Sequence, residues 1–133
     1  MTPSLEEAHR FLALARADFA AFRVLASNAG IRPAIALFHA QQAVEKSLKA
    51  LLFAQGVEFR RTHDLFELAD KLQACGVALP SRVESVGKLN PYAVSFRYDS
   101  HDADLMSLEQ ADQIAQDVLH WAAVTVTAIA TKP

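Results

Sequence analysis

The side chains best suited to chemistry in this chain of 133 residues include a basic group just before a predicted helix. Arg60, Arg61 and His63 directly precede Asp64, where we expect that helix to begin. Backbone N–H groups and the helix dipole favour anions at a helix N-terminus, so His63 and Arg61 are candidates for contacting a phosphate. The alternative is that Thr62, His63 and Asp64 only cap the helix.

A second group lies later in the chain, where three residues separate Arg97 from His101. A guanidinium can hold a phosphate through two hydrogen bonds, and an imidazole can move a proton near neutral pH. If this segment is helical, the two side chains share a face one turn apart. Asp99 and Asp102 would compete for Arg97 and repel an anion. The alternative is therefore that Arg97 pairs with Asp99 or with a helix terminus, and that His101 is a solvated loop residue.

The segment from Phe38 to Gly56 predicts a helix with three distinct faces. At about 100° per residue, its apolar residues form a core face and its polar residues a row opposite to it. The core face consists of Leu37, Ala40, Val44, Leu48 and Leu51, the polar row of His39, Gln42, Lys46 and Lys49, and a third stripe of Ala36, Ala43, Ser47, Ala50 and Ala54. The polar row is either a ligand-binding surface or a solvated face. The small residues permit close approach of another helix, either within the chain or from a second copy.

Capping residues predict where the helices begin and end. The first helix should begin at Thr2 and Pro3, with a Ser4–Glu7 capping box, and reach about Ser27; the second should begin at Pro33 and end at Gly56. A short third helix should begin at an Asp64–Glu67 capping box and end near Gly76. A fourth should run from Pro80 to Asn90, and a Ser107–Gln110 cap should begin a long last helix. The backbone from Tyr92 to Asp99 is the hardest to predict, because Pro91 disfavours helix in the residue before it. Short connections between amphipathic helices indicate an all-α, up-and-down antiparallel bundle of four long helices and a short fifth.

Composition and charge limit the class of protein. One domain over residues 1–133 is expected for a chain of this length with 52% hydrophobic residues. The single cysteine, Cys75, excludes an internal disulfide and is most simply a small buried hydrophobe. We expect no metal site and no cofactor, because no two histidines have the spacing of a metal pair. A net charge of −2 and the lack of a long apolar stretch predict a cytoplasmic protein with no membrane partner, in which nucleic acid could bind only at a local basic patch.

Several segments of the chain carry a family resemblance. The run FHAQQAVEKSLKALL from Phe38, a following glycine, THDL at residues 62–65, YAVSFRYD at residues 92–99 and a final long helix resemble the HEPN family (higher eukaryotes and prokaryotes nucleotide-binding). The resemblance implies a helical bundle and a homodimer. RNases of this superfamily carry an arginine and a histidine with four to six residues between them, and the gap between Arg97 and His101 is one residue shorter. The tyrosine that is modified in some family toxins is replaced here by Ala103.

The same segment matches the RY pair of the branch that is not ribonucleolytic, through Tyr92, Arg97 and Tyr98. That match implies a nucleotide- or substrate-binding partner of a separately encoded small nucleotidyltransferase, in a two-component system resembling toxin–antitoxin pairs. The alternatives are a divergent, metal-independent endoribonuclease toxin that uses Arg97 and His101, and a dimerisation module without catalysis. The residues expected to bind a nucleotide or RNA are Arg97, Tyr98, Tyr92, His63, Arg61, Lys46, Gln42 and His39.

Overall fold

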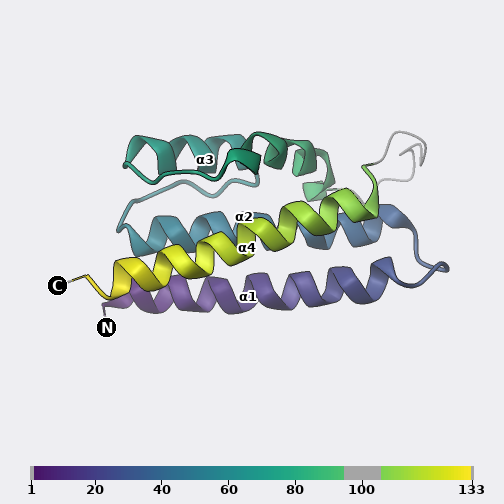
Figure 1. Cartoon of the computed structure of the whole chain (residues 1–133), viewed down its shortest axis with the longest axis horizontal. Helices are drawn as coiled ribbons and strands as arrows, with labels where there is room; N and C mark the ends of the chain where they lie inside the picture. Colours follow the sequence, from purple (N-terminus) through teal and green to yellow (C-terminus); the bar gives the residue numbers. More distant parts are fainter. Residues whose placement is uncertain (1, 95–105, 133) are drawn as a thin grey trace.

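The computed structural model describes residues 2–94 and 106–132, without the side chains of residues 81–85 and 94. In chain order the elements are α1 (Pro3–Ala26), α2 (Pro33–Ala54), α3 (Leu65–Ala74), the 3₁₀ helix η1 (Ser81–Val94) and α4 (Leu108–Ala130). All of the described elements are helices, as Figure 1 shows. The expected all-α bundle is confirmed.

The N-terminus of α1 is fixed by Thr2 rather than by the expected Ser4–Glu7 capping box. The Thr2 hydroxyl accepts a hydrogen bond from the backbone N–H of Leu5 at 3.2 Å, and Pro3 occupies the first turn, where no N–H is needed. Ser4 already lies inside the helix. Glu7 instead accepts two hydrogen bonds of 2.9 Å from Arg10, one turn further on. The capping box is therefore replaced by a cap two residues earlier.

Glycines end α2 and α3 as expected. Gly56 has φ +67° and Gly76 has φ +85°, in the left-handed region that a side chain disfavours. At the end of α2 the N–H of Gly56 donates to the carbonyl of Phe53, and the N–H of Val57 donates to that of Leu52, both at 3.0 Å. This is the Schellman pattern, which satisfies two otherwise unpaired carbonyls and turns the chain away from the helix axis.

Side-chain caps also begin α3 and α4. Asp64 accepts from the N–H of Phe66 at 3.0 Å, and Ser107 accepts from the N–H of Gln110 at 3.0 Å. Glu67 does not complete the capping box that the sequence predicts, because its carboxylate accepts three hydrogen bonds from Arg60. The predicted starts are correct, while one predicted partner is engaged elsewhere.

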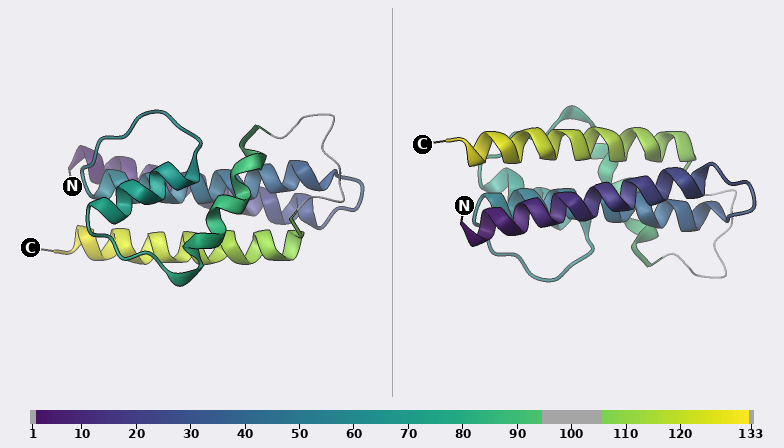
Figure 2. Two further views of the ribbon diagram at one scale, coloured as in Figure 1. Left: turned by 90° about the horizontal axis from the view of Figure 1, so that it is seen from above. Right: turned by 90° about the horizontal axis from the view of Figure 1, so that it is seen from below.

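The three longest elements of the described chain, α1, α2 and α4, lie lengthwise beside one another (Figure 1). A short connection makes α1 and α2 antiparallel, as expected. In contrast, α4 runs in the same direction as α2, because the chain between them passes through α3 and η1 (Figures 1 and 2). Within the described residues the bundle thus has three long helices rather than four, with α3 and η1 packed over α2. The expected fourth α-helix forms instead as η1, which continues through Pro91 to Val94.

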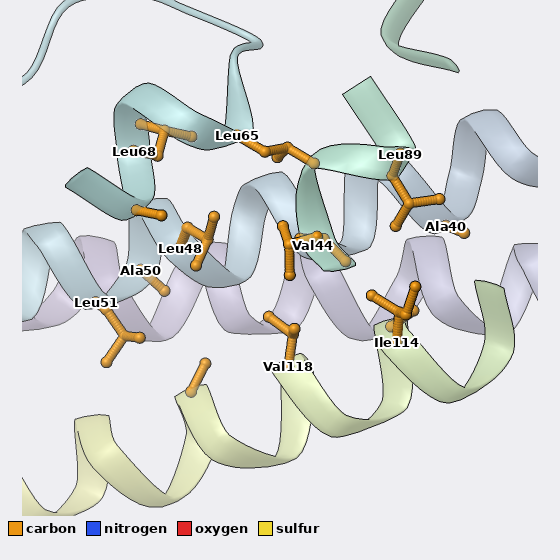
Figure 3. Packing of buried hydrophobic residues seen from close by; sticks show 14 of the residues in the cluster. Ala40, Val44, Leu48, Ala50, Leu51, Leu65, Leu68, Leu89, Ile114 and Val118 are labelled. Carbon is orange, nitrogen blue, oxygen red and sulfur yellow. The ribbon is translucent and has the colours of Figure 1, made fainter. Parts of the chain in front are cut away.

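The core is organised around α2, which packs against each of the other elements. Its predicted core face is completely buried, and Figure 3 shows Val44 and Leu48 between side chains of α3, η1 and α4. Four of the five residues in the small-residue stripe are buried as well: Ala36, Ala43, Ser47 and Ala50 are at most 1% exposed, whereas Ala54 near the end of α2 is half-buried. These four residues therefore serve contacts within the chain.

Two further expectations concern single features. Cys75 is exposed rather than buried, and its Sγ lies 3.3 Å from the carbonyl oxygen of Leu72. None of the helices within residues 2–94 and 106–132 combines the length and apolar character needed to cross a membrane.

Candidate functional site

A cavity of about 880 Å³ opens at the end of the bundle where α1 begins and α2 ends. Ser4 and Phe11 of α1 form one part of its wall, and Lys49 and Phe53 of α2 form another. The segment that follows α2 closes it. From this segment the lining residues are Gly56, Val57, Glu58, Phe59, Arg61, Thr62 and His63. Small-molecule sites commonly have volumes of 300 to 1,000 Å³, so the cavity has the size of a ligand site.

The third wall is the segment that follows α2, and its path is set at the C-terminus of that helix. After the left-handed turn at Gly56, the chain does not return directly along the bundle but arches outward until Asp64 caps α3 (Figure 2). Residues 57–64 themselves belong to no helix or strand. Phe59 is half-buried beneath this arch, whereas Arg61 and His63 remain exposed. The cavity therefore has an apolar interior and a basic rim.

Three phenylalanines form the apolar interior. The ring centroids of Phe11 and Phe53 lie 5.0 Å apart, and those of Phe53 and Phe59 lie 5.2 Å apart with nearly perpendicular planes. The planes of the first pair are tilted by 51°, and the second pair, at 69°, has the edge-to-face geometry that aromatic rings prefer. A cluster of rings at a cavity wall offers faces and edges on which a flat, unsaturated ligand can pack.

Lys49, Arg61 and His63 supply the basic groups of the rim. Within the described part of the chain, no acidic side chain pairs with Arg61. Its guanidinium is therefore available to a ligand, and such a group suits phosphate or carboxylate oxygens. Glu58 is the acidic residue of the lining and restricts where an anion can sit.

A buried carboxylate supports this rim from below. The side chain of Glu45 on α2 is only 4% exposed, and its Oε2 accepts a hydrogen bond from Lys49 Nζ at 3.0 Å. Its Oε1 lies 3.1 Å from Gln41 Nε2 and 2.9 Å from His63 Nδ1. Gln41 Nε2 also donates to the backbone carbonyl of His63 at 3.3 Å. A buried carboxylate is costly unless it is fully hydrogen-bonded, and here it fixes the position of His63.

Arg60 does not join its neighbours at the cavity. Its guanidinium donates to both carboxylate oxygens of Glu67 at 2.7 to 3.0 Å. The hydrogen bonds to Glu67 and its negative charge raise the pKa of Arg60, with a smaller contribution from Asp64. Of the two adjacent arginines, Arg60 attaches the arch to α3 and Arg61 serves the cavity.

Of the polar row of α2, Lys49 lines the cavity, whereas the three predicted site residues of that row lie outside the lining. His39 Nδ1 lies 3.0 Å from Asp18 on α1, and the ammonium of Lys46 binds the other oxygen of the same carboxylate. Gln42 donates to the side-chain oxygen of Gln41 at 2.7 Å. His39 and Lys46 thus connect α1 with α2, and the surface expected to be solvated or ligand-binding is a contact between helices.

Of the remaining predicted site residues, the structure describes Tyr92, which lies near the C-terminal end of η1. Tyr92 is buried, and its hydroxyl accepts a hydrogen bond from the N–H of Met106 at 2.8 Å, just before the cap of α4. This position gives Tyr92 a structural contact rather than a place in the cavity. Arg97, Tyr98 and His101 fall outside the described residues. Of the predicted set, the cavity therefore includes Arg61 and His63.

Sequence reasoning missed Phe11, Phe53 and Phe59 as cavity residues. Lys49 was predicted within the polar row of the second helix, for which a ligand-binding surface was one of the two interpretations. One signal was available: Phe59 directly precedes the arginines at positions 60 and 61, which places an aromatic ring next to basic side chains in the sequence. In the part of the chain that the structure describes, no group of three or more His, Cys, Asp or Glu side chains is placed to hold a metal ion.

Comparison with known families agrees with the helical architecture. The family model described as HEPN domain matches residues 4–125, a span that includes the cavity and every described helix except the last residues of α4 and the first of α1. No curated protein and no solved structure matches the chain. Because the family match covers most of the sequence, the chain belongs to the HEPN domain family.

Proposed function

We propose that this HEPN-domain protein is a binding subunit that takes a nucleotide into the cavity between α1, α2 and residues 57–63. The observation that carries the proposal is the combination of three aromatic rings with a basic rim in one cavity. A nucleotide has the matching chemistry, since its base is flat and its phosphates are anionic.

The two parts of the cavity divide the ligand between them. The base packs against Phe53 and Phe59, where removal of apolar surface from water favours binding. The phosphates lie toward Arg61, whose charge is not neutralised by a neighbour in the described chain. Lys49 contributes less, because its ammonium is held by Glu45.

We further propose that the protein acts with a separately encoded small nucleotidyltransferase in a two-component system, and that it forms a homodimer. Family membership supports this part of the proposal, and the cavity adds a place for the nucleotide or substrate that such a pair would share. The test is co-expression with a nucleotidyltransferase encoded by a neighbouring gene. We expect the two proteins to purify as one stable complex.

Isothermal titration calorimetry with ATP and GTP tests the binding site. We expect saturable binding that Arg61→Ala weakens about tenfold or more, because a charge-assisted hydrogen bond contributes about 1.5 to 3 kcal/mol. Phe59→Ala should weaken binding to a similar extent through loss of the ring contact. Absence of heat at millimolar nucleotide would contradict the proposal.

Arg16→Ala is the matched control for charge. Arg16 is exposed on α1 and does not line the cavity, so this variant removes one positive charge without touching the site. Equal losses in Arg16→Ala and Arg61→Ala would show that nucleotide is attracted by overall charge and not by this cavity.

Induced expression in bacteria separates binding from the endoribonuclease alternative. A binding subunit leaves growth unaffected, whereas a toxin arrests growth and Arg97→Ala or His101→Ala relieves the arrest. Growth arrest relieved by these substitutions, but not by Arg61→Ala, would replace the binding proposal with the ribonuclease.

A further inference from the structure

The contact between Glu45 and His63 determines which atom of the imidazole faces a ligand. Glu45 is buried on α2, and His63 lies on the arch with its side chain 62% exposed at the cavity rim. Oε1 of Glu45 is 2.9 Å from Nδ1 of His63. Nδ1 is thereby occupied, and Nε2 is the ring nitrogen left for the cavity.

The chemistry of the carboxylate fixes the tautomer of this imidazole. A carboxylate only accepts hydrogen bonds, so a ring nitrogen that contacts it carries a proton. Oε1 and Oε2 of Glu45 already accept from Gln41 and Lys49, which are donors through their amide and ammonium groups. His63 therefore holds its proton on Nδ1, and the neutral ring presents Nε2 as a hydrogen-bond acceptor.

We infer that Glu45 is a positioning residue of the cavity, which holds His63 in the Nδ1–H tautomer so that Nε2 accepts a hydrogen bond from a hydroxyl of the ligand. The part of this inference that concerns the ligand rests on the proposed nucleotide site, whereas the part that concerns the tautomer does not. His63 Nε2 then places an acceptor beside Arg61 and Lys49, which only donate, and Glu58 is a further acceptor in the same lining. A ligand that carries both an anionic group and a hydroxyl, such as a ribonucleotide, matches this combination.

Nuclear magnetic resonance of the imidazole nitrogens tests the tautomer without any ligand. The spectrum is recorded at about pH 8.5, well above the ordinary titration range of histidine, and His63→Asn identifies the signals among the five histidines. We expect a protonated Nδ1 and an unprotonated Nε2 for His63. The Nε2–H tautomer, which predominates in freely solvated histidine, would overturn the inference.

Glu45→Gln tests whether Glu45 sets the tautomer. A glutamine has one side-chain oxygen. The ammonium of Lys49 is a charged donor and therefore binds this oxygen more strongly, so the amide N–H₂ turns toward Nδ1 of His63. We expect His63 to change to the Nε2–H tautomer in this variant. Retention of the Nδ1–H form in folded Glu45→Gln would show that another group controls the ring.

Binding of ATP and of 2′,3′-dideoxy-ATP, which lacks both ribose hydroxyls, tests the role of Nε2. The wild type should bind ATP about three- to tenfold more tightly, the size of one hydrogen bond. His63→Asn keeps a donor near the position of Nδ1 for Glu45 and lacks Nε2, so it should fold normally and lose this preference. Equal wild-type affinities would overturn the ligand part of the inference. If neither nucleotide binds, both the proposed function and this ligand part fail, while the tautomer result still decides the role of Glu45.

Discussion

Lys46 and Lys49 lie three residues apart on α2, yet their ammonium groups have different surroundings. Lys46 binds Asp18 of α1, whereas Lys49 binds Glu45 of its own helix and lines the cavity. The sequence places both in one polar row, because periodicity gives the face of a helix but not its neighbour. The distinction between a contact that joins helices and one that serves a site therefore came only from the structure.

Arg10→Ala should raise the pKa of Glu7. The side-chain hydrogen bonds from Arg10 lower this pKa in the folded protein, and its positive charge adds to the effect. A lowered folded-state pKa means that the pair contributes stability above the unfolded-state pKa of Glu7, and this contribution is lost as the pH falls through the folded-state value. A carbon-detected titration of the Glu7 carboxyl measures the change, and Arg16→Ala should leave it unaltered.

Leu48→Ala should lower the free energy of unfolding by about 2 to 5 kcal/mol. Leu48 is completely buried between α2 and its neighbours, so its removal leaves a cavity in the core (Figure 3). Urea denaturation measures the loss. Leu14→Ala is the comparison, because Leu14 is 37% exposed on α1 and should cost much less. Equal losses in the two variants would contradict the central position of α2.

At the scale of the elements, α3 and η1 are joined through a glycine and a phenylalanine. A Cβ atom at Gly87 would lie 1.8 Å from Cζ of Phe66, so the ring occupies the space that any other side chain would need. Asn90 strengthens the same junction by accepting from the N–H of Leu65 at 2.8 Å and donating to Asp64. These contacts hold the N-terminus of α3, and with it the end of the arch.

Gly87→Ala should destabilise the protein by displacing the ring of Phe66. Phe66 is 54% exposed and has room to move outward, so we expect a loss of about 1 to 2 kcal/mol, toward the lower part of the range for overpacking. In a Phe66→Ala background the same substitution should cost nothing. A double-mutant cycle by urea denaturation measures the coupling, and additive effects would show that the two positions do not interact.

The caps made the helix boundaries predictable, whereas the cavity was not. Gly56, Gly76 and Ser107 act locally, and their residue types alone indicate a helix end or start. Phe11 and Phe53 meet only because α1 and α2 pack antiparallel, over a separation of 42 residues. No local pattern carries that information. Pro91 was expected to end a helix, but η1 continues through it.

At the scale of the whole molecule, one end of the bundle combines the features that a site requires. The start of α1, the end of α2 and both chain termini lie there (Figure 1). The sequence-based expectation centred on residues 92–101, chiefly on Arg97 and His101, whereas the described cavity involves residues 4–63. His63 and Arg61 belong to both accounts. Sequence reasoning identified these two residues because they lie just before α3. It did not predict the aromatic wall that makes them part of a cavity.

The most direct test of the central claim is a titration of ¹⁵N-labelled protein with ATP, followed by amide chemical shifts. We expect the largest changes at Phe53, Gly56, Phe59, Arg61 and His63. Arg61→Ala should reduce them at the same ATP concentration, while Arg16→Ala should not. Changes confined to residues 92–101, with the amides of residues 53–63 unaffected, would contradict the claim.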